Sequence, residues 1–287
     1  MTRRAKKVSV VIPSYNRPSD TAVAICSALA QDGVEVEVLV VDDGSVPPLE
    51  LPTDLAREPR VRLLRAPANG GAAAARNIGI EAARHDWIAF LDSDDEFLPG
   101  KLAAQLDLAD PSLPLQVVVC GFRYHRLETG STKDLVPIPA RGLQDFSSGC
   151  WFCPGSTALT HWSAFTVVGM LDERLRRLED VDWFLRLGKA GGGIVASPIC
   201  GALINVGKNA APDLVDGAAA LMLAEHHDLP ASARRRLEAY LALEQAAARA
   251  KRREWLPALS AAFRSFRAVP RRTLHLRRWW STGAEGQ

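Results

Sequence analysis

The segment 87–99 constrains the fold more than any other part of the chain, because an apolar run there ends in a group of carboxylates. It begins W-I-A-F-L and continues with Asp92, a serine, Asp94 and Asp95. Such a cluster repels itself unless a metal ion or a cationic partner neutralises it. Mg2+ and Mn2+ are usually held by one or two carboxylates together with substrate phosphates. The pattern therefore predicts a divalent-cation site beside a phosphate-bearing ligand, with a solvated acidic turn as the alternative.

Upstream of this segment, strand-like and helix-like stretches alternate. Residues 8–12, 36–41 and 61–64 are rich in β-branched and aliphatic side chains, whereas 19–31 and 72–84 carry apolar residues at helical spacing. This alternation predicts parallel crossover units in an open α/β sheet. Ligands bind at the carboxyl ends of the strands in such sheets. Three polar groups are therefore expected to line one crevice: Ser14-Tyr15-Asn16, Asp42-Asp43 and Asp92-Ser93-Asp94.

Length and composition agree with a globular enzyme. The chain has 287 residues, of which 47% are hydrophobic and 24% charged, and its formal net charge is +2. No apolar run reaches the roughly 18 residues needed to span a bilayer. No secretory signal is visible at the N-terminus, so a cytoplasmic protein is expected. The absence of G-x-G-x-x-G after the first strand argues against a dinucleotide dehydrogenase.

Several motifs in a fixed order resemble the family 2 glycosyltransferases of the GT-A fold. The resemblance covers about residues 8–190 and is carried by V-S-V-V-I-P-S-Y-N-R (8–17), V-V-D-D-G-S (40–45), N-G-G-A-A-A-A-R-N (69–77), F-L-D-S-D-D (90–95) and a later stretch (169–187). It implies a Rossmann-like, mostly parallel central sheet flanked by helices. It also implies inverting transfer of a sugar from a nucleoside-diphosphate sugar to a hydroxyl acceptor, such as a glycan or lipid-linked glycan of cell-surface polysaccharide synthesis.

The resemblance also assigns a set of residues to the nucleotide sugar: Pro13, Tyr15, Asp43, Arg76, Asp92 and Ser93. Asp43 matches the carboxylate that reads the nucleobase, for which uracil is favoured, and Tyr15 offers an aromatic face for stacking. Tyr15 could equally be a plain edge aromatic. Arg76 suits base or phosphate oxygens, with a surface ion pair as the alternative.

The D-x-D motif of the family falls on Asp92 and Asp94. Asp94 is the expected direct ligand of Mn2+ or Mg2+, whereas Asp92 would face the ribose or bind the ion through water. The ion would stabilise the charge that develops on the diphosphate leaving group. Asp42 could serve the nucleotide or cap the following turn. Asp95 could simply begin the next helix.

Asp180 matches the catalytic base of the family, which takes the proton of the acceptor hydroxyl. Glu179 is its neighbour and a second candidate. The alternative is an acidic helix N-terminus that has no catalytic role. Asp182 is expected to be exposed or to cap the helix.

Two further residues have weaker assignments. Trp151 lies where such enzymes form an acceptor wall, although a tryptophan beside an apolar strand is more often part of the core. Lys208 stands where the family often places a histidine or arginine near the diphosphate. A lysine in a glycine-containing loop is usually solvated.

The chain divides into three expected parts: a nucleotide-sugar-binding half (1–110), an acceptor and catalytic-base half (111–212) and a helical, basic extension (213–287). Residues 231–280 contain thirteen Lys or Arg and three Glu, so this segment carries about +10. Its arginines and tryptophans suit peripheral contact with an anionic membrane at the inner face of the cell membrane. A cover for the catalytic domain or a dimer contact explains the helices equally well. No nucleic-acid reader motif is recognised.

Two other functions explain part of the sequence. A nucleotide-sugar-binding scaffold without activity would keep the same fold but would lack Asp94 or Asp180, and both are present. A metal-dependent phosphatase also places D-x-D after a strand. It would leave the nucleotide-side motifs unexplained.

Overall fold

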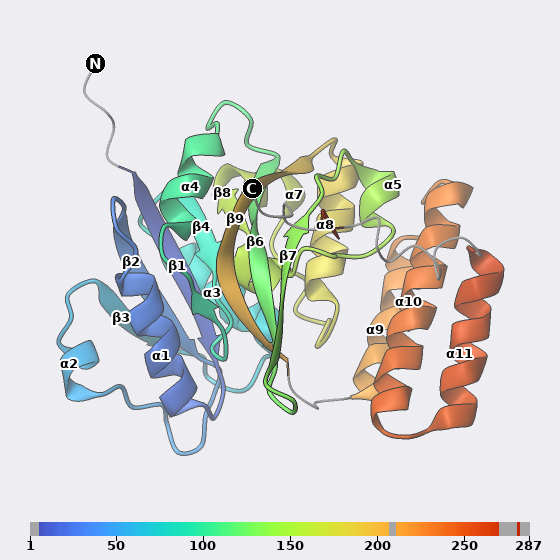
Figure 1. Ribbon diagram of the computed structural model, residues 1–287, viewed down its shortest axis with the longest axis horizontal. Coiled ribbons are helices and arrows are strands. Elements are labelled where there is room, and N and C mark those ends of the chain that lie inside the picture. The colour runs from blue at the N-terminus through green and yellow to red at the C-terminus, as the bar shows by residue number, and fades with distance from the viewer. Residues whose placement is uncertain (1–5, 207–210, 270–279, 282–287) are drawn as a thin grey trace.

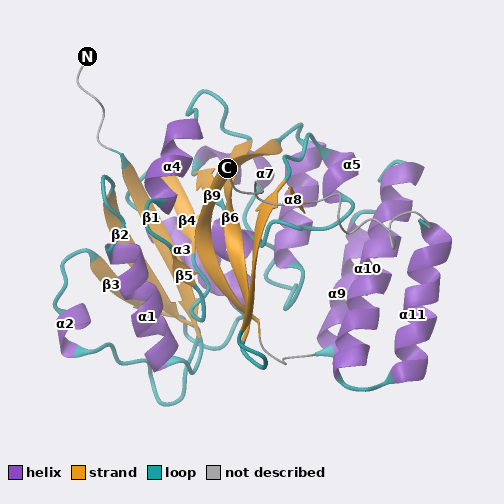
Figure 2. Cartoon of the chain, in the orientation of Figure 1, coloured by secondary structure: helices purple, strands orange, loops and turns teal. Residues whose placement is uncertain are grey.

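The computed structural model describes residues 6–206, 211–269 and 280–281. In these ranges a ten-stranded sheet carries helices on both faces, and three helices stand together at one side of it (Figures 1 and 2). The strands are β1 (Lys7–Ser14), β2 (Glu35–Asp42), β3 (Val61–Arg65), β4 (Trp87–Phe90), β5 (Glu96–Phe97), β6 (Gln116–Arg126), β7 (Ser131–Pro137), β8 (Leu159–His161), β9 (Gly193–Val206) and β10 (Trp280–Ser281). The helices are α1 (Pro18–Leu29), α2 (Thr53–Ala56), α3 (Ala72–Ala82), α4 (Lys101–Leu108), α5 (Leu143–Phe146), α6 (Pro154–Thr157), α7 (Ser163–Val168), α8 (Glu179–Lys189), α9 (Pro212–Glu225), α10 (Ala231–Lys251) and α11 (Trp255–Ala268).

The first half of the sheet is parallel, in the order β3-β2-β1-β4. Its register pairs Ser14 at the end of β1 with Asp42 at the end of β2. Beyond β4 the sheet continues through the antiparallel β8 and β6, and β9 runs parallel to β6. The predicted α/β fold is therefore confirmed, with antiparallel strands added in the second half.

Alternate side chains of β1 enter two different cores. Val10 and Ile12 pack with buried residues of α1 and α4, whereas Val11 packs on the other face with Ile80 of α3. Helix α3 lies very close to the sheet. A Cβ on Gly79 would lie 2.3 Å from a methyl carbon of Val11, so only glycine fits there. This contact fixes the helix that carries Arg76.

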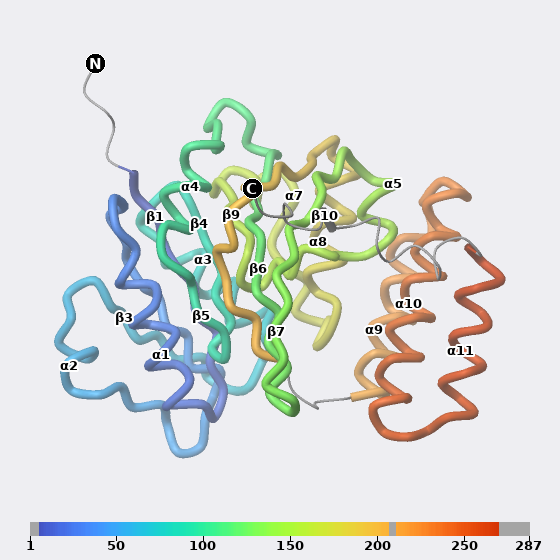
Figure 3. The backbone as a smooth tube through the Cα atoms, viewed as in Figure 1, coloured from blue at the N-terminus to red at the C-terminus, as the bar shows by residue number. Residues whose placement is uncertain are grey.

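The C-terminal helices α9, α10 and α11 lie side by side, as the backbone trace in Figure 3 shows. Leu237 and Leu241 of α10 share one hydrophobic cluster with Val181 and Leu185 of α8. The C-terminal helices are therefore anchored to α8 through apolar burial. Among the described residues, none of the helices is both long and apolar enough to cross a membrane.

A buried polar contact adds to this anchoring. Asp182 of α8 is 4% exposed; its Oδ1 lies 2.8 Å from His226 Nε2, and its Oδ2 accepts a 2.9 Å hydrogen bond from Arg186 Nε. The expectation that Asp182 is exposed or capping was wrong. Helical periodicity turned it inward, toward the end of α9.

Candidate active site

The carboxyl ends of β1, β2 and β4 meet at one edge of the sheet, and a pocket of about 540 Å3 opens there. Its walls include the residues predicted for the nucleotide sugar and the metal, together with one of the two expected acids of α8: Pro13, Tyr15, Asp43, Arg76, Asp92, Ser93, Asp94 and Glu179. The expected crevice therefore exists, although Asn16 and Asp42 do not line it. Pro13, Asp43 and Asp92 are far apart in the chain but line one pocket because parallel strands end on the same side.

Asp43 holds the glycine loop that precedes α3. Its two carboxylate oxygens accept hydrogen bonds from the backbone N–H groups of Gly70 (2.7 Å) and Gly71 (2.8 Å). Gly71 has φ of +90°, a conformation that favours glycine. Asp43 is only 4% exposed, yet it lines the pocket. Each carboxylate oxygen has a second lone pair, so Asp43 can still accept from a nucleobase N–H. Tyr15 is 46% exposed at the same pocket, and its ring is free to stack.

Asp42 points away from the pocket. Its oxygens accept hydrogen bonds from the backbone N–H groups of Ser45 (2.9 Å) and Leu49 (3.0 Å), and it pairs with Arg65. Burial alone would raise the pKa of Asp42, but these hydrogen bonds and the arginine outweigh it and lower the pKa. Asp42 is therefore placed to hold the turn after β2.

Arg76 lies at the centre of the site and is 6% exposed. Its Nη2 donates to Asp92 Oδ1 at 2.6 Å, its Nη1 donates to Glu179 Oε1 at 2.7 Å, and its guanidinium lies 5.7 Å from the ring centre of Phe90. Burial disfavours its charge, but the two carboxylates raise its pKa. Within the described part of the chain, Arg76 Nε has no hydrogen-bond partner. Arg76 joins the strand-end carboxylates to helix α8.

The acidic cluster after β4 is divided among different partners. Asp94 pairs with Arg17, and Asp92 pairs with Arg76. Asp95 is 5% exposed and accepts from Ser156 Oγ (2.6 Å) and the Asn205 backbone N–H (2.9 Å). Burial and the nearby charge of Asp92 raise the pKa of Asp95 well above its usual value. Asp95 thus ties the turn after β4 to α6 and to the end of β9.

The residues present fit a divalent cation that is held partly by its substrate. Among the described residues, no group of three or more His, Cys, Asp or Glu side chains is arranged to hold a metal. Asp92 and Asp94 nevertheless present hard oxygen ligands to the large pocket, with side chains 39% and 38% exposed. One or two carboxylates suffice when diphosphate oxygens complete the coordination.

Asp180 lines a second pocket of about 280 Å3, which shares Arg76, Asp92 and Glu179 with the first. Asp180 is the second residue of α8, and its Oδ1 accepts a 2.8 Å hydrogen bond from the Val181 N–H. The helix begins after Leu178, whose φ of +64° is strained for a side chain of this size. That conformation turns Glu179 and Asp180 toward the two pockets.

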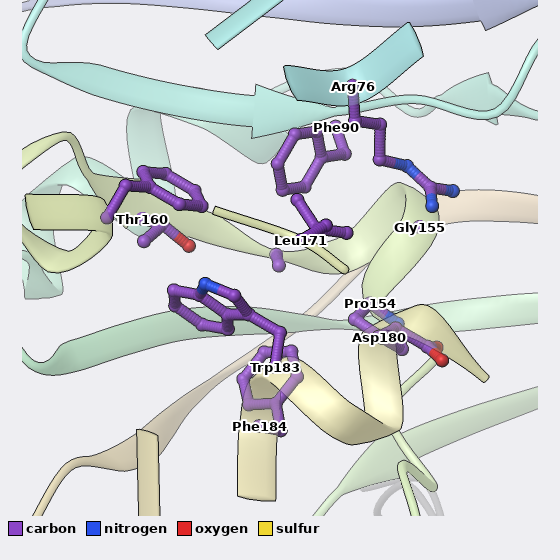
Figure 4. Close-up of a pocket in the computed structure, with 11 residues that line it drawn as sticks. Arg76, Phe90, Pro154, Gly155, Thr160, Leu171, Asp180, Trp183 and Phe184 are labelled. Carbon is purple, nitrogen blue, oxygen red and sulfur yellow. The ribbon is translucent and has the colours of Figure 1, made fainter. Parts of the chain in front are cut away.

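A small cavity of about 20 Å3 lies behind Asp180, and Figure 4 shows its aromatic lining. Phe90, Trp183 and Phe184 line it, and Arg76 and Asp180 stand at the same end of it. The apolar wall keeps water away from one side of the carboxyl. Burial and the neighbouring Glu179 charge raise the pKa of Asp180 to about 7, although Arg76 and Arg177 oppose the shift. A general base works best with a pKa near the operating pH.

Of the two weaker assignments, Trp151 lies among the described residues. Trp151 is 8% exposed, belongs to the main hydrophobic cluster and donates from its indole N–H to the Ile138 carbonyl at 3.1 Å. It lines neither pocket. Lys208 lies outside the described residues.

The structure adds site residues that the motifs did not single out: Arg17, Arg176, Arg177, Leu214, Tyr240 and Glu244. Arg17 ends the first motif, and Arg176 and Arg177 lie just before α8, so their positions in the chain could have indicated them. Tyr240 and Glu244 lie about sixty residues after Asp180, in a helix without a recognisable motif.

A mostly parallel α/β sheet with a pocket at the carboxyl ends of its strands belongs to the class of α/β folds that bind a ligand at that edge. The family model described as Glycosyl transferase family 2 matches residues 9–166, so the chain belongs to that family.

Curated relatives share part of this chain. It is 40% identical over 140 residues to the succinoglycan biosynthesis protein ExoO of Rhizobium meliloti, which covers 49% of this chain and 37% of that protein. It is 33% identical over 204 residues to the pre-mycofactocin glycosyltransferase of Mycobacterium tuberculosis, covering 68% of this chain and 42% of that protein. The chain thus spans less than half the length of these two relatives.

Solved structures of TarS from S. aureus have the same fold. Residues 1–349 of TarS in complex with UDP-GlcNAc superpose with a TM-score of 0.61, at 19% sequence identity, and cover 93% of this chain and 82% of that chain. At this identity the likeness establishes the fold.

Proposed function

We propose that this protein is an inverting, metal-dependent glycosyltransferase. It moves a sugar from a nucleoside-diphosphate sugar, with UDP favoured, to a hydroxyl of a glycan or lipid-linked glycan of cell-surface polysaccharide synthesis. The observation that carries the proposal is the pair of adjoining pockets, one at the strand ends and one beside Asp180, which share Arg76. The relative named for succinoglycan biosynthesis and the UDP-GlcNAc complex of TarS support the choice of substrates.

In this proposal the donor occupies the larger pocket. Asp43 accepts from the nucleobase and Tyr15 stacks on it, while Pro13, Asp92 and Ser93 line the wall nearer the ribose and sugar. Asp94 is the direct ligand of Mn2+ or Mg2+, which when bound would supply positive charge to the diphosphate.

The reaction needs a base for the acceptor hydroxyl and positive charge that stabilises the departing diphosphate. Asp180 accepts the proton of the acceptor hydroxyl as that oxygen bonds to the anomeric carbon. The bond from that carbon to the diphosphate breaks, its electron pair leaves with the diphosphate, and the anomeric configuration inverts. Arg176 and Arg177 are cations that line the larger pocket, and their charges favour the departing phosphates.

The test is transfer from a panel of UDP-, GDP- and dTDP-sugars to a panel of glycosides, with Mn2+ or with a chelator. The proposal expects a metal-requiring product whose new bond has the configuration opposite to that of the donor, as measured by NMR couplings. Retention of configuration would contradict the inverting mechanism. Full activity in chelator would contradict the metal requirement.

We also infer that the C-terminal part of the chain contacts an anionic membrane. Helix α11 contains two arginines and no acidic residue, and it exposes five large apolar side chains by 44–82%: Trp255, Leu256, Leu259, Phe263 and Phe266. At 3.6 residues per turn these five fall within an arc of about 100°, with Arg267 beside it. An apolar stripe bordered by arginine suits anionic headgroups over acyl chains. The arginines and tryptophan of 270–279, on which this membrane contact was first expected, lie outside the described residues.

A further inference from the structure

We infer that helix α10 completes the acceptor site, where Tyr240 and Glu244 bind a neutral or amine-bearing sugar ring beside Asp180. The inference rests on the proposed function and adds to it the class of acceptor at this subsite. It assigns part of the active site to the C-terminal helices.

The second pocket has walls from several distant parts of the chain. Residues 153–156 form one wall, 177–180 form another with Asp180 at the opening of α8, and Arg76, Asp92, Asp95 and Ile204 also line it. Tyr240 and Glu244 add a further wall; they are four residues apart, so they lie on the same face of α10. Figure 1 shows α10 standing between α9 and α11 on the side of the sheet where α8 lies. Without α10, the pocket beside Asp180 would be open to solvent on that side.

The tyrosine is held in a defined position. The ring of Tyr240 packs directly on Gly149. A Cβ at position 149 would lie only 2.3 Å from the nearest ring carbon, and glycine, with φ of +96°, leaves that space open. The helix itself is fixed by the buried Leu237 and Leu241. A binding group needs such support, because a side chain that must be ordered on binding weakens the affinity.

The charges around this pocket determine which rings it favours. Arg76 is neutralised by Asp92 and Glu179, and Asp95 is occupied by Ser156 and Asn205. The remaining charged lining groups are Asp180, Glu244 and the single cation Arg177.

Tyr240 is itself close to these acids. Burial, the charges of Glu244 and Asp180 and a side-chain hydrogen bond to Glu244 raise its pKa well above the usual value, so its hydroxyl stays protonated and donates to Glu244. Carboxylates accept hydrogen bonds from sugar hydroxyls or from an ammonium group, whereas they repel a phosphate or a carboxylate. The volume of about 280 Å3 is near the lower end of ligand pockets, which suits one sugar ring.

The experiment measures ring binding directly, so it requires neither the natural acceptor nor turnover. The full chain is saturated with UDP and Mn2+, and saturation-transfer NMR titrations use methyl glucoside, methyl glucosaminide, methyl glucuronide and methyl glucoside 6-phosphate. We expect the first two to bind on the order of tenfold or more tightly than the two anionic rings.

Two variants test the residues. Glu244→Gln should weaken glucosaminide binding on the order of tenfold, since a hydrogen bond to a charged group is lost. Tyr240→Phe should weaken both ligands by a smaller factor. The matched control is Glu238→Gln on the same helix, whose carboxylate pairs with Arg234 outside the pocket and should leave ring binding unchanged. UDP affinity, measured by calorimetry, should be the same in all of them and serves as the check on folding.

Three results would overturn the inference: equal binding of the anionic rings, unchanged glucosaminide binding in Glu244→Gln, or no ring bound at about 50 mM while UDP binds normally. Failure of the proposed function would give a different result: the protein without substitutions would bind no nucleoside diphosphate.

Discussion

Arg76 and Glu179 lie 103 residues apart in the chain and form a buried ion pair, with 2.7 Å between Arg76 Nη1 and Glu179 Oε1. Their side chains are 7% and 12% exposed. Because Arg76 also binds Asp92, one guanidinium holds together the segment that follows β4 and the start of α8. Charge compensation at this point therefore contributes both to the fold and to the geometry between the two pockets.

Removing the guanidinium should destabilise the fold. Arg76→Ala leaves Asp92 and Glu179 without their cation, and breaking a buried pair by removing one partner costs about 3–5 kcal/mol in the free energy of unfolding. Urea unfolding followed by circular dichroism measures the loss. Arg174→Ala is the control, because Arg174 also binds two acids but is 60% exposed, so its loss should change little. Equal effects of the two substitutions would show that burial of the Arg76 pair does not matter.

The pH dependence of transfer should report Asp180. A base must be deprotonated, so kcat/KM should fall about tenfold for each unit of pH below about 7, the pKa of Asp180, and level off above it. Glu179→Gln removes a negative neighbour that raises this pKa, so the midpoint should move to lower pH. If the midpoint were unchanged in Glu179→Gln, the pH dependence of kcat/KM would not report the titration of Asp180 beside Glu179.

Asp180→Asn should abolish transfer while UDP binding persists. The amide keeps the size of the side chain but cannot accept the proton, and general-base catalysis is worth roughly two to four powers of ten in rate. Initial rates and UDP calorimetry are measured on the same preparations. Near-normal turnover in Asp180→Asn together with loss in Glu179→Gln would transfer the role of base to Glu179.

Nucleoside diphosphate binding should depend on a divalent ion through Asp94. Asp94→Ala should weaken UDP binding in Mn2+ toward the value measured in chelator, because a hard oxygen ligand is lost. Calorimetric titration of UDP with and without Mn2+ tests this. Arg17→Ala, which removes the cation that pairs with Asp94, should preserve the Mn2+ dependence. If Asp94→Ala keeps both its affinity and its metal dependence, the ligand has been assigned wrongly.

Association with anionic vesicles should depend on the apolar face of α11. Leu256→Gln together with Phe263→Gln should reduce sedimentation with vesicles containing phosphatidylglycerol on the order of tenfold or more, since each buried side chain contributes about 1.5–3 kcal/mol. Leu127→Gln is the matched control, because Leu127 is 58% exposed but lies in the turn between β6 and β7.

Truncation after Val269 separates the helix from the segment that follows it. If truncation abolishes sedimentation while the α11 double variant sediments normally, the membrane contact belongs to residues after Val269. Equal sedimentation of all variants would rule out membrane contact by either part.

The local pattern of the sequence was enough to predict most of the strand-end residues that line the larger pocket. The apolar runs that end at Pro13, Asp43 and Asp92 predict strands, and parallel strands must present their following residues at one edge. Asp94 and Asp180 were located by motifs of a few adjacent residues. These features depend on short-range periodicity and on the resemblance, both of which can be recognised within a single segment of the chain.

Tertiary packing alone decided which distant side chains meet. Asp182 was expected at the surface, yet it is buried against His226, and Tyr240 and Glu244 lie beside Asp180 without any local signal. Strand and helix periods specify which face of an element is apolar, but they do not specify which other element covers that face. Which element covers that face depends on how well whole surfaces fit and how much apolar area they bury. A charge buried by this packing must then pair with an opposite charge that the same packing brings close.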